Sequence, residues 1–303
     1  MTGPRADVEI PIDPDGGPPF LPDHRRGSRL LGNRAFLIST ASTILFLAIV
    51  VSVVVLAPGF RAVREQFLNL HDMKEAFFGN PSQGLPPIWR GFLLNVEVFL
   101  VAEVLILILA LLIAVIRQIP GPVFFPFRML AVAYTDLFRG TPLLLVMYIF
   151  GFGLPALAIR GLSTQSVTVY GTAALVLSYS AYVSEVYRAG IESVHYSQVA
   201  AARSLGLSRW QALRFVVLPQ AVRRVIPPLL NDFVSLQKDT ALLAVLGSIE
   251  AARAAQIYSA YRFNYSSFTV AAFLFILLTI PLARFTDHLI ARDRRRRASG
   301  GAL

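Results

Sequence analysis

Seven ionisable side chains lie within long apolar stretches of this sequence, and they are the first candidates for chemistry. A charge inside a bilayer costs ~2.5–3.5 kcal/mol on insertion scales, so such side chains normally face a cavity or a partner. The seven are Glu97, Glu103, Asp136, Glu185, Asp232, Lys238 and Asp239. Their charged groups could bind a small polar solute or a coupling ion.

Two pairs of neighbouring charges differ in how they can be neutralised. Glu185 and Arg188 are three residues apart, so they share a helix face and can form an ion pair. That pair is either structural or part of a solute pathway. Lys238 and Asp239 are adjacent, so they point in different directions and cannot neutralise each other. Each needs a partner on another helix, on a second subunit or on a zwitterionic substrate, and these alternatives stay open.

The residues that enzymatic chemistry requires are absent or scattered. The sequence has no cysteine, which excludes disulfides, thiolate catalysis and cysteine-ligated metal sites. Neither of the two lysines, Lys74 and Lys238, follows a glycine as a phosphate-binding loop requires. The histidines are far apart in the sequence: His24, His71, His195 and His288. We therefore expect no catalytic residue, no metal site and no cofactor bound by this chain, which argues against an intramembrane hydrolase.

The segment 197–219 predicts two short helices joined by a tight turn. Gly206 ends the first helix, because glycine adopts the left-handed conformation without steric cost. Ser208 and Gln211 have the spacing of a capping box, which starts a second helix. Pro219 is expected to end that helix, since it lacks an N–H group. These features fit a projecting contact element, but also a re-entrant or merely connecting loop.

Small and basic side chains give this segment a surface suited to another protein. Ala200, Ala201 and Ala202 leave one side smooth enough for close approach, while Arg203 and Arg209 can reach acidic groups on a partner. A protein contact is therefore one interpretation of this segment, beside a re-entrant or connecting loop.

The elements that position these residues are membrane helices. Of the 303 residues, 55% are hydrophobic and only 15% are charged, against about 25% in soluble domains. Uncharged stretches of about 20 residues are each long enough to cross a bilayer. The sequence thus predicts an all-α polytopic membrane protein with about six transmembrane helices. They are expected near 35–58, 92–116, 129–157, 164–187, 225–248 and 266–291.

The distribution of basic residues predicts the orientation. With both termini in the cytoplasm, the inner segments hold 18 Lys and Arg and the outer segments hold seven, as the positive-inside rule requires. The polar, proline-rich segment 1–34 is expected to be a disordered cytoplasmic tail, and 292–303 a basic cytoplasmic tail. The loop 188–224 is then cytoplasmic. The outer loop 59–90 forms either a short interfacial helix or a contact with an extracellular partner.

Four motifs resemble those of permease subunits of ATP-binding cassette (ABC) importers. The Ala triplet, Gly206 and the Leu218-Pro219 pair have the spacing of the EAA signature, Glu-Ala-Ala, three residues, Gly, nine residues, Ile-x-Leu-Pro. The other motifs are similar to the FRGTPLL, EIFRGGI and KDTSL segments of the polar amino acid subfamily, the histidine- and glutamine-type permeases. They begin at Phe138, Glu185 and Lys238. The resemblance extends over roughly 95–290.

The resemblance implies a type I importer bundle over 91–291 that forms half of a dimeric pore. The partners would be a cytoplasmic ATP-binding subunit, an extracytoplasmic solute-binding protein, membrane lipid and a second copy or related permease. ATP would be bound by the partner, and the location would be the plasma membrane of a prokaryote. The carried solute, and whether the pore is a homodimer or a heterodimer, are not indicated.

Residue roles follow from the resemblance. The ATPase-coupling residues would be Ala200, Ala201, Ala202, Arg203, Gly206, Arg209, Leu218 and Pro219. The pathway or gate would contain Glu185, Lys238, Asp239 and Thr240. Arg139, Gly140, Thr141 and Pro142 would be a structural motif, with Arg139 snorkelling to the inner interface and Gly140 and Pro142 bending the span.

The sequence also departs from the family pattern in two ways. Ala200 stands where the signature has Glu, so any ion pair of that Glu with the ATPase is missing. The helix 35–58 and the loop 59–90 are additions to a five-span plan. A secondary transporter that couples ions through intramembrane carboxylates is the alternative function, although no repeat relates the two halves of the sequence.

Overall fold

The computed structural model describes the backbone of residues 33–300 and the side chains of 36–292. Within this part of the chain, four helices are long and apolar enough to cross a membrane, and two bent helix pairs raise the number to as many as six. The prediction of about six spans is therefore confirmed. The first is α2 (Asn33–Leu56), which belongs to a separate unit, residues 1–63. The expected tail 1–34 lies almost entirely outside the described residues.

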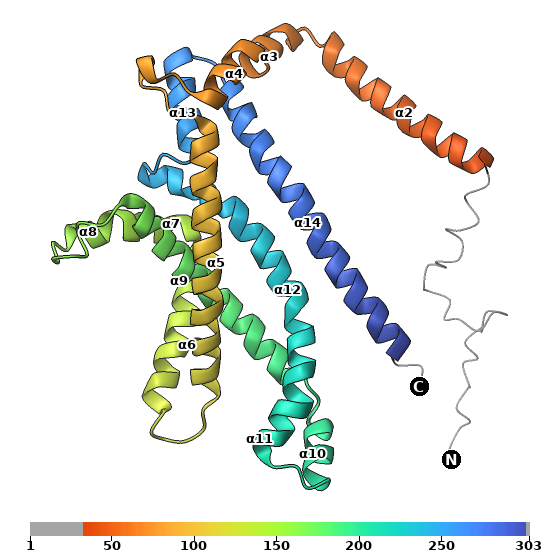
Figure 1. Cartoon of the computed structure of the whole chain (residues 1–303), viewed down its shortest axis with the longest axis vertical. Coiled ribbons are helices and arrows are strands. Elements are labelled where there is room, and N and C mark those ends of the chain that lie inside the picture. Colours follow the sequence, from red (N-terminus) through yellow and green to blue (C-terminus); the bar gives the residue numbers. More distant parts are fainter. Residues whose placement is uncertain (1–32, 301–303) are drawn as a thin grey trace, which may run out of the picture. The chain divides into compact units, whose positions relative to one another are not determined.

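The second unit is a bundle centred on α5 (Ile88–Gln118), α9 (Val167–Glu192) and α12 (Leu218–Asp239). α5 has 31 residues, so it is about 46 Å long. Small and branched side chains from the three helices interlock in the core, among them Ala102, Ile106, Ala174, Leu175 and Leu236. Figure 1 shows α5 upright beside α9 and α12. This core fixes the helices that carry the pathway residues.

The span predicted at 129–157 is broken. α6 (Phe125–Gly140) is followed by α7 (Leu143–Tyr148), a π turn η2 (Ile149–Gly153) and α8 (Leu154–Ala156), and the two halves meet at 107°. The cause is local: Pro142 disfavours helical geometry in the preceding residue, and Thr141 is extended at φ −105°, ψ 128°. The predicted bend at this motif is confirmed.

The prediction that Pro219 ends a helix is wrong. α11 (Arg209–Ala212), the π turn η3 (Leu213–Val217) and α12 follow one another without a break in the helical backbone. Pro219 occupies the first turn of α12, where a helix tolerates a missing N–H group. The widened π turn precedes it, and the Gln220 side chain donates to the Val216 carbonyl at 3.0 Å. The long inner loop is thus largely helical.

Several short helices were not predicted. After α12 the chain tightens into η4 (Thr240–Leu246) and turns at Gly247 into α13 (Ala251–Arg262), a stretch that was expected to be a loop. In the loop 59–90, by contrast, a short helix was one of the two expectations, and the structure has α3 (Phe60–Phe67), α4 (Leu70–Phe78) and η1 (Pro81–Gln83) there. α14 (Ser266–Gly300) runs on through most of the segment expected to be a basic tail.

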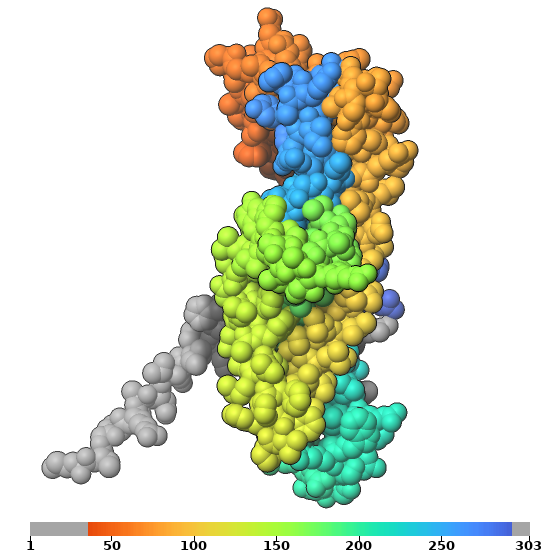
Figure 2. Space-filling view, turned by 90° about the vertical axis from the view of Figure 1, so that its left-hand side faces the viewer, coloured from red at the N-terminus to blue at the C-terminus, as the bar shows by residue number. Residues whose placement is uncertain are grey.

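Short helices form both ends of the second unit. The cap end contains α4, η1 and α13, and the hairpin end contains α10 (Tyr196–Ser204) and α11. Figure 2 shows α10 and α11 next to the connection between α5 and α6, and α13 with α4 at the opposite end of the bundle. The predicted site residues are divided between the hairpin end and the interior.

Candidate functional site

The α10–α11 hairpin, residues 195–217, is closed by bonds within its own sequence. The His195 side chain caps α10 by accepting from the Ser197 N–H at 3.3 Å. Gly206 has φ +85°, and the Leu207 N–H donates to the Ala202 carbonyl at 3.2 Å, which forms a Schellman turn. Ser208 and Gln211 bond reciprocally, so the predicted capping box is confirmed. These bonds fix the angle between the two helices.

The alanine triplet is divided between the inside and the outside of the hairpin. Ala202 and Ala212 are buried and hold α10 against α11, whereas Ala201 is exposed and Ala200 is half-buried. The expected smooth stripe is therefore shorter than predicted. Large side chains dominate the exposed surface instead, with Tyr196 80%, Leu205 84% and Trp210 67% exposed.

The basic and proline residues of the hairpin differ in how they are used. Arg203 donates to the Leu207 carbonyl at 3.0 Å, so part of its guanidinium supports the turn. Arg209 is exposed and forms no ion pair with a described residue. Leu218 and Pro219 are also exposed, in the first turn of α12. Arg209, Leu218 and Pro219 can therefore meet a partner.

Two bonds between distant residues tie the hairpin to the bundle. Gln220 on α12 donates to the Gln198 side chain on α10 at 2.5 Å. Arg224 donates to the Ser193 carbonyl at the end of α9. Movement of the hairpin would therefore be transmitted to α9 and α12.

Glu185 lies at the hairpin end of α9 between two arginines. The predicted pair with Arg188 is confirmed, with an N–O distance of 2.7 Å. Arg117, at the end of α5, forms a second ion pair with Glu185 and bonds Thr135 on α6. Arg117 was not among the predicted site residues, although a basic residue at the end of a span is a recognisable signal. Glu185 therefore joins α5 to α9, and its carboxylate is already neutralised.

Lys238, Asp239 and Thr240 have three different environments at the end of α12. Tyr179 on α9 donates to Asp239 Oδ2 at 2.7 Å, so Asp239 has an inter-helix partner. Thr240 is buried, donates to the Gln237 carbonyl at 2.8 Å and accepts from Asn95 Nδ2 at 3.2 Å. Lys238 is exposed and has no ion pair within the described part of the chain. Of the three, Lys238 is available to a solute or a second subunit.

The Arg139–Pro142 motif forms the bend between α6 and α7. Arg139 is at the end of α6 away from the α5–α6 connection, with its guanidinium carbon 5.9 Å from the Tyr182 ring centre. Tyr182 in turn donates to the Arg139 carbonyl at 3.1 Å. The expectation that Arg139 snorkels to the inner interface stays a prediction. Arg139 stabilises the bend through its contacts with Tyr182 on α9.

The cap end contains a charged cluster that the sequence analysis did not predict. Arg262 on α13 pairs with Glu75 on α4 at 2.7 Å, and Tyr258 donates to Glu75 Oε2 at 2.7 Å. Asn80 also donates to Glu75, at 2.7 Å, and these donors lower the pKa of Glu75 from 4.5 to about 2. Asn264 donates to Asp72 at 2.5 Å. The only local signal was the Asn69 cap of α4.

The sequence matches one protein family and a consistent set of relatives. Residues 119–295 match the family described as "Binding-protein-dependent transport system inner membrane component". The chain is 33% identical over 222 residues to the probable glutamine ABC transporter permease protein GlnP of Bacillus subtilis, covering 72% of this chain and 99% of that protein. It is 37% identical over 171 residues to GlnM of the same organism, a probable glutamine permease, covering 56% and 77%. It is 31% identical over 208 residues to the arginine transport system permease protein ArtQ of B. subtilis, covering 69% and 92%.

Solved structures show the same architecture. An amino acid ABC transporter crystallised with histidines superposes with a TM-score of 0.62 at 28% identity, covering 68% of this chain and 93% of that one. The MetNI methionine ABC transporter in an inward-facing form gives a TM-score of 0.55 at 16% identity, covering 71% and 99%. The second likeness establishes the fold alone. The type I importer bundle expected from the sequence is confirmed.

Proposed function

We propose that this chain, which belongs to the family of binding-protein-dependent transport system inner membrane components, forms half of a dimeric pore for an amino acid. As a permease subunit of an ATP-driven importer it works with an ATP-binding subunit and a solute-binding protein. Relatives named for glutamine and arginine transport support an amino acid as the solute. ATP is held by the partner subunit, and the pore contains either two copies of this chain or one copy with a related permease.

The α10–α11 hairpin is the element that couples the pore to the ATPase. The observation that carries this assignment is a self-closed pair of helices whose exposed surface is rich in large apolar side chains. Exposed aromatic residues such as Trp210 are typical anchors of protein interfaces. The positive-inside count supports a cytoplasmic position for both termini and this hairpin, on the side of the ATPase.

Lys238 is the pathway residue, and the neighbouring Asp239 connects α12 to α9. Lys238 is exposed inside the span region without an ion partner in the described chain, whereas Asp239 is held by Tyr179. Glu185 is neutralised by Arg117 and Arg188, so its role is to connect helices at the cytoplasmic side. A secondary transporter is disfavoured by the family to which the chain belongs.

The test is co-purification of the ATP-binding subunit with this chain in mild detergent, followed by solute-stimulated ATP hydrolysis and uptake in vesicles. Lys238→Met should leave the complex assembled while uptake of glutamine or arginine falls at least about tenfold, the effect of losing ~1.4 kcal/mol. Asp239→Asn, which can still accept from Tyr179, is the matched control and should lose less. Uptake by the chain alone, without an ATPase, would contradict the proposed function.

A further inference from the structure

A second intramembrane charge, Glu97, lies apart from both the hairpin and the Lys238 region. It is nine residues along α5 from Ile88, about 13 Å from the start of the helix. Trp89 and Arg90, whose guanidinium carbon is 5.3 Å from the Trp89 ring centre, mark that start as the membrane interface. Glu97 is exposed and has no hydrogen bond or ion pair within the described residues. A carboxylate in this position is costly unless something binds it.

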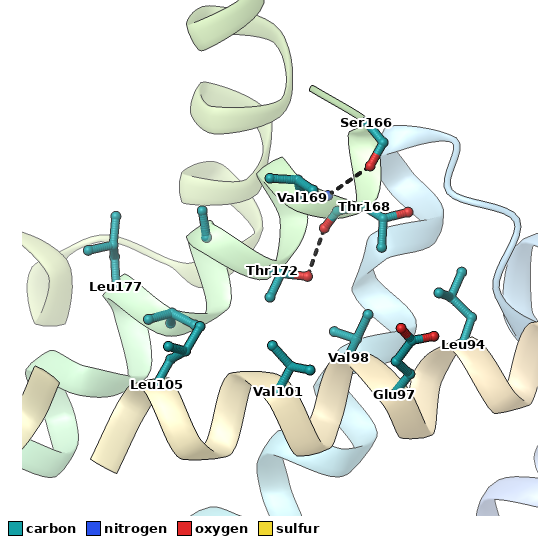
Figure 3. A pocket seen from close by; sticks show the side chains of 12 residues that line it. Leu94, Glu97, Val98, Val101, Leu105, Ser166, Thr168, Val169, Thr172 and Leu177 are labelled. Carbon is teal, nitrogen blue, oxygen red and sulfur yellow. Dashed lines mark hydrogen bonds between the residues drawn. The ribbon is translucent and has the colours of Figure 1, made fainter. Parts of the chain in front are cut away.

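Glu97 reaches into a pocket of about 550 Å³ between α5 and the first turns of α9. That volume is within the usual range for small-molecule sites. The walls are mostly apolar, with Leu94, Val98 and Val101 from α5. Figure 3 shows the Glu97 carboxylate opposite the hydroxyl side chains at the start of α9. The pocket therefore combines one charge with an apolar surround.

The hydroxyl groups in the pocket offer further oxygen acceptors. Thr172 Oγ1 donates its hydrogen to the Thr168 carbonyl at 2.8 Å, so its lone pairs are left to accept a further hydrogen bond. Thr168 Oγ1 is bonded to Ser248 Oγ at 2.8 Å, and Ser166 Oγ accepts from the Val169 N–H at 3.4 Å. The polar side chains of the pocket thus carry a negative charge and no positive one. The complementary ligand is a cation that can donate several hydrogen bonds.

We infer that this pocket binds the ammonium group of an amino-acid solute on its way through the permease. A primary ammonium supplies three donors, which match the Glu97 carboxylate and the Thr172 hydroxyl. The apolar walls weaken competition from water and strengthen the charge interaction. The inference rests on the proposed function, and it adds the chemical group that the pathway recognises.

The natural absence of cysteine allows a direct test in the full-length chain. Ala173→Cys places a single thiol in the pocket lining and leaves Glu97 and Thr172 intact. Its labelling by aminoethyl methanethiosulfonate, a cation, is compared with labelling by sulfonatoethyl methanethiosulfonate, an anion, each rate normalised to that of free mercaptoethanol. We expect the cation to be favoured about tenfold, and this preference to collapse when Glu97→Gln is added. Millimolar arginine should slow the cationic labelling while Glu97 is present.

The matched control is Glu103→Gln, a second carboxylate on α5 that does not line this pocket. Glu103→Gln should change the labelling preference of the single-cysteine chain by no more than about twofold. That is well below the factor of ten that ~1.4 kcal/mol represents. In the assembled importer, Glu97→Gln should raise the half-saturating concentration for arginine and glutamine uptake about tenfold or more, as expected for losing one charge-assisted bond. Glu97→Asp, which keeps the charge, should bring the half-saturating concentration part of the way back to the wild-type value.

The outcomes separate this inference from the proposed function. An unchanged labelling preference in the Glu97→Gln chain, or unchanged uptake by the assembled Glu97→Gln importer, overturns the ammonium site and leaves the permease function standing. If the cysteine-bearing chain shows a cation preference that Glu97→Gln abolishes, but the wild-type importer takes up neither amino acid, the cation pocket is supported and the proposed function is contradicted. If the Glu97→Gln complex does not assemble, labelling of the chain alone decides.

Discussion

The cap end and the hairpin end of the bundle are both made of short helices, but they are held in different ways. At the cap, bonds join residues that are far apart in the sequence, as in the pairs Arg262–Glu75 and Asn264–Asp72. At the hairpin, most bonds join residues within five positions, such as Ser208–Gln211. The cap therefore depends on the packed bundle. The hairpin keeps its own shape and presents its side chains outward.

The difference extends to the backbone. Gly91 on α5 lets α13 approach so closely that a Cβ atom at this position would be 2.6 Å from the Glu250 backbone carbon. Gly206 in the hairpin has open space around it, and glycine is needed only for its positive φ. One glycine serves packing between elements, and the other sets the conformation of a turn. The cap thus connects packed elements of the bundle, whereas the hairpin is a rigid projection.

The largest expected effect is at the hairpin turn. Gly206→Val places a β-branched residue at φ +85°, which is strained although no atom obstructs it. We expect the protein to insert in the membrane but to lose at least about 90% of uptake, since ~1.4 kcal/mol of lost coupling is a factor of ten. ATP hydrolysis should become insensitive to solute, or the ATPase should dissociate; both are measured in one membrane preparation.

Gly206→Asn is the matched control, because asparagine tolerates positive φ better than other side chains. It should retain most of the uptake and the co-purified ATPase. If the Val variant matched wild type in both assays, the hairpin would not be the coupling element. The structural contrast between the hairpin end and the cap end would then not extend to function.

The sequence predicted the features that neighbouring residues encode. The spans followed from local hydropathy, and the Gly206 turn and the Ser208 capping box from spacings of a few positions. The bend at Pro142 was predictable for the same reason, because a proline restricts the residue before it. These features were found because each depends on a short stretch of chain.

The features that the sequence did not predict depend on contacts between distant residues. The bonds Arg117–Glu185 and Tyr179–Asp239 each join residues about 60 or more positions apart, so no short-range spacing pairs them. The cap cluster joins α4 to α13 over more than 180 positions. The error at Pro219 has another origin, because proline is also favoured in the first turn of a helix.

An intermediate effect is expected at the cap. Glu75→Gln removes the ion pair with Arg262 and should lower stability by ~1 kcal/mol, or about 2–4 °C in melting temperature, after allowance for water at the pair. The pKa of Glu75 is lowered from 4.5 to about 2, so the stabilisation is complete above pH 4.5 and is lost as pH falls towards 2. The difference between variant and wild type should therefore shrink between pH 5 and pH 3.

Melting in detergent across this pH range is the measurement, and Glu65→Gln is its control. Glu65 is an exposed carboxylate nearby without an ion pair in the described chain, and its replacement should change stability by less than about 0.5 kcal/mol. Equal melting temperatures of the Glu75 and Glu65 variants would show that the Glu75 bonds do not stabilise the cap. ATPase coupling should survive in both, in contrast to Gly206→Val.

The smallest effect is expected from restoring the glutamate that the EAA signature has at position 200. Ala200 lies within α10, half-buried, where glutamate is a good helix former, so Ala200→Glu should cost well under 1 kcal/mol in folding. If the hairpin is a preformed projection, a carboxylate added on its contact side should hold the ATPase equally well or up to about threefold more tightly, the scale of one exposed ion pair.

Ala201→Glu is the matched control, because the next position points about 100° away around α10 and is exposed. Titration of the ATP-binding subunit onto both variants in nanodiscs measures the difference, which should shrink at high salt. Weaker binding by Ala200→Glu than by Ala201→Glu would place the contact on another side of α10, and would move the docking surface towards Trp210 and the α11 face.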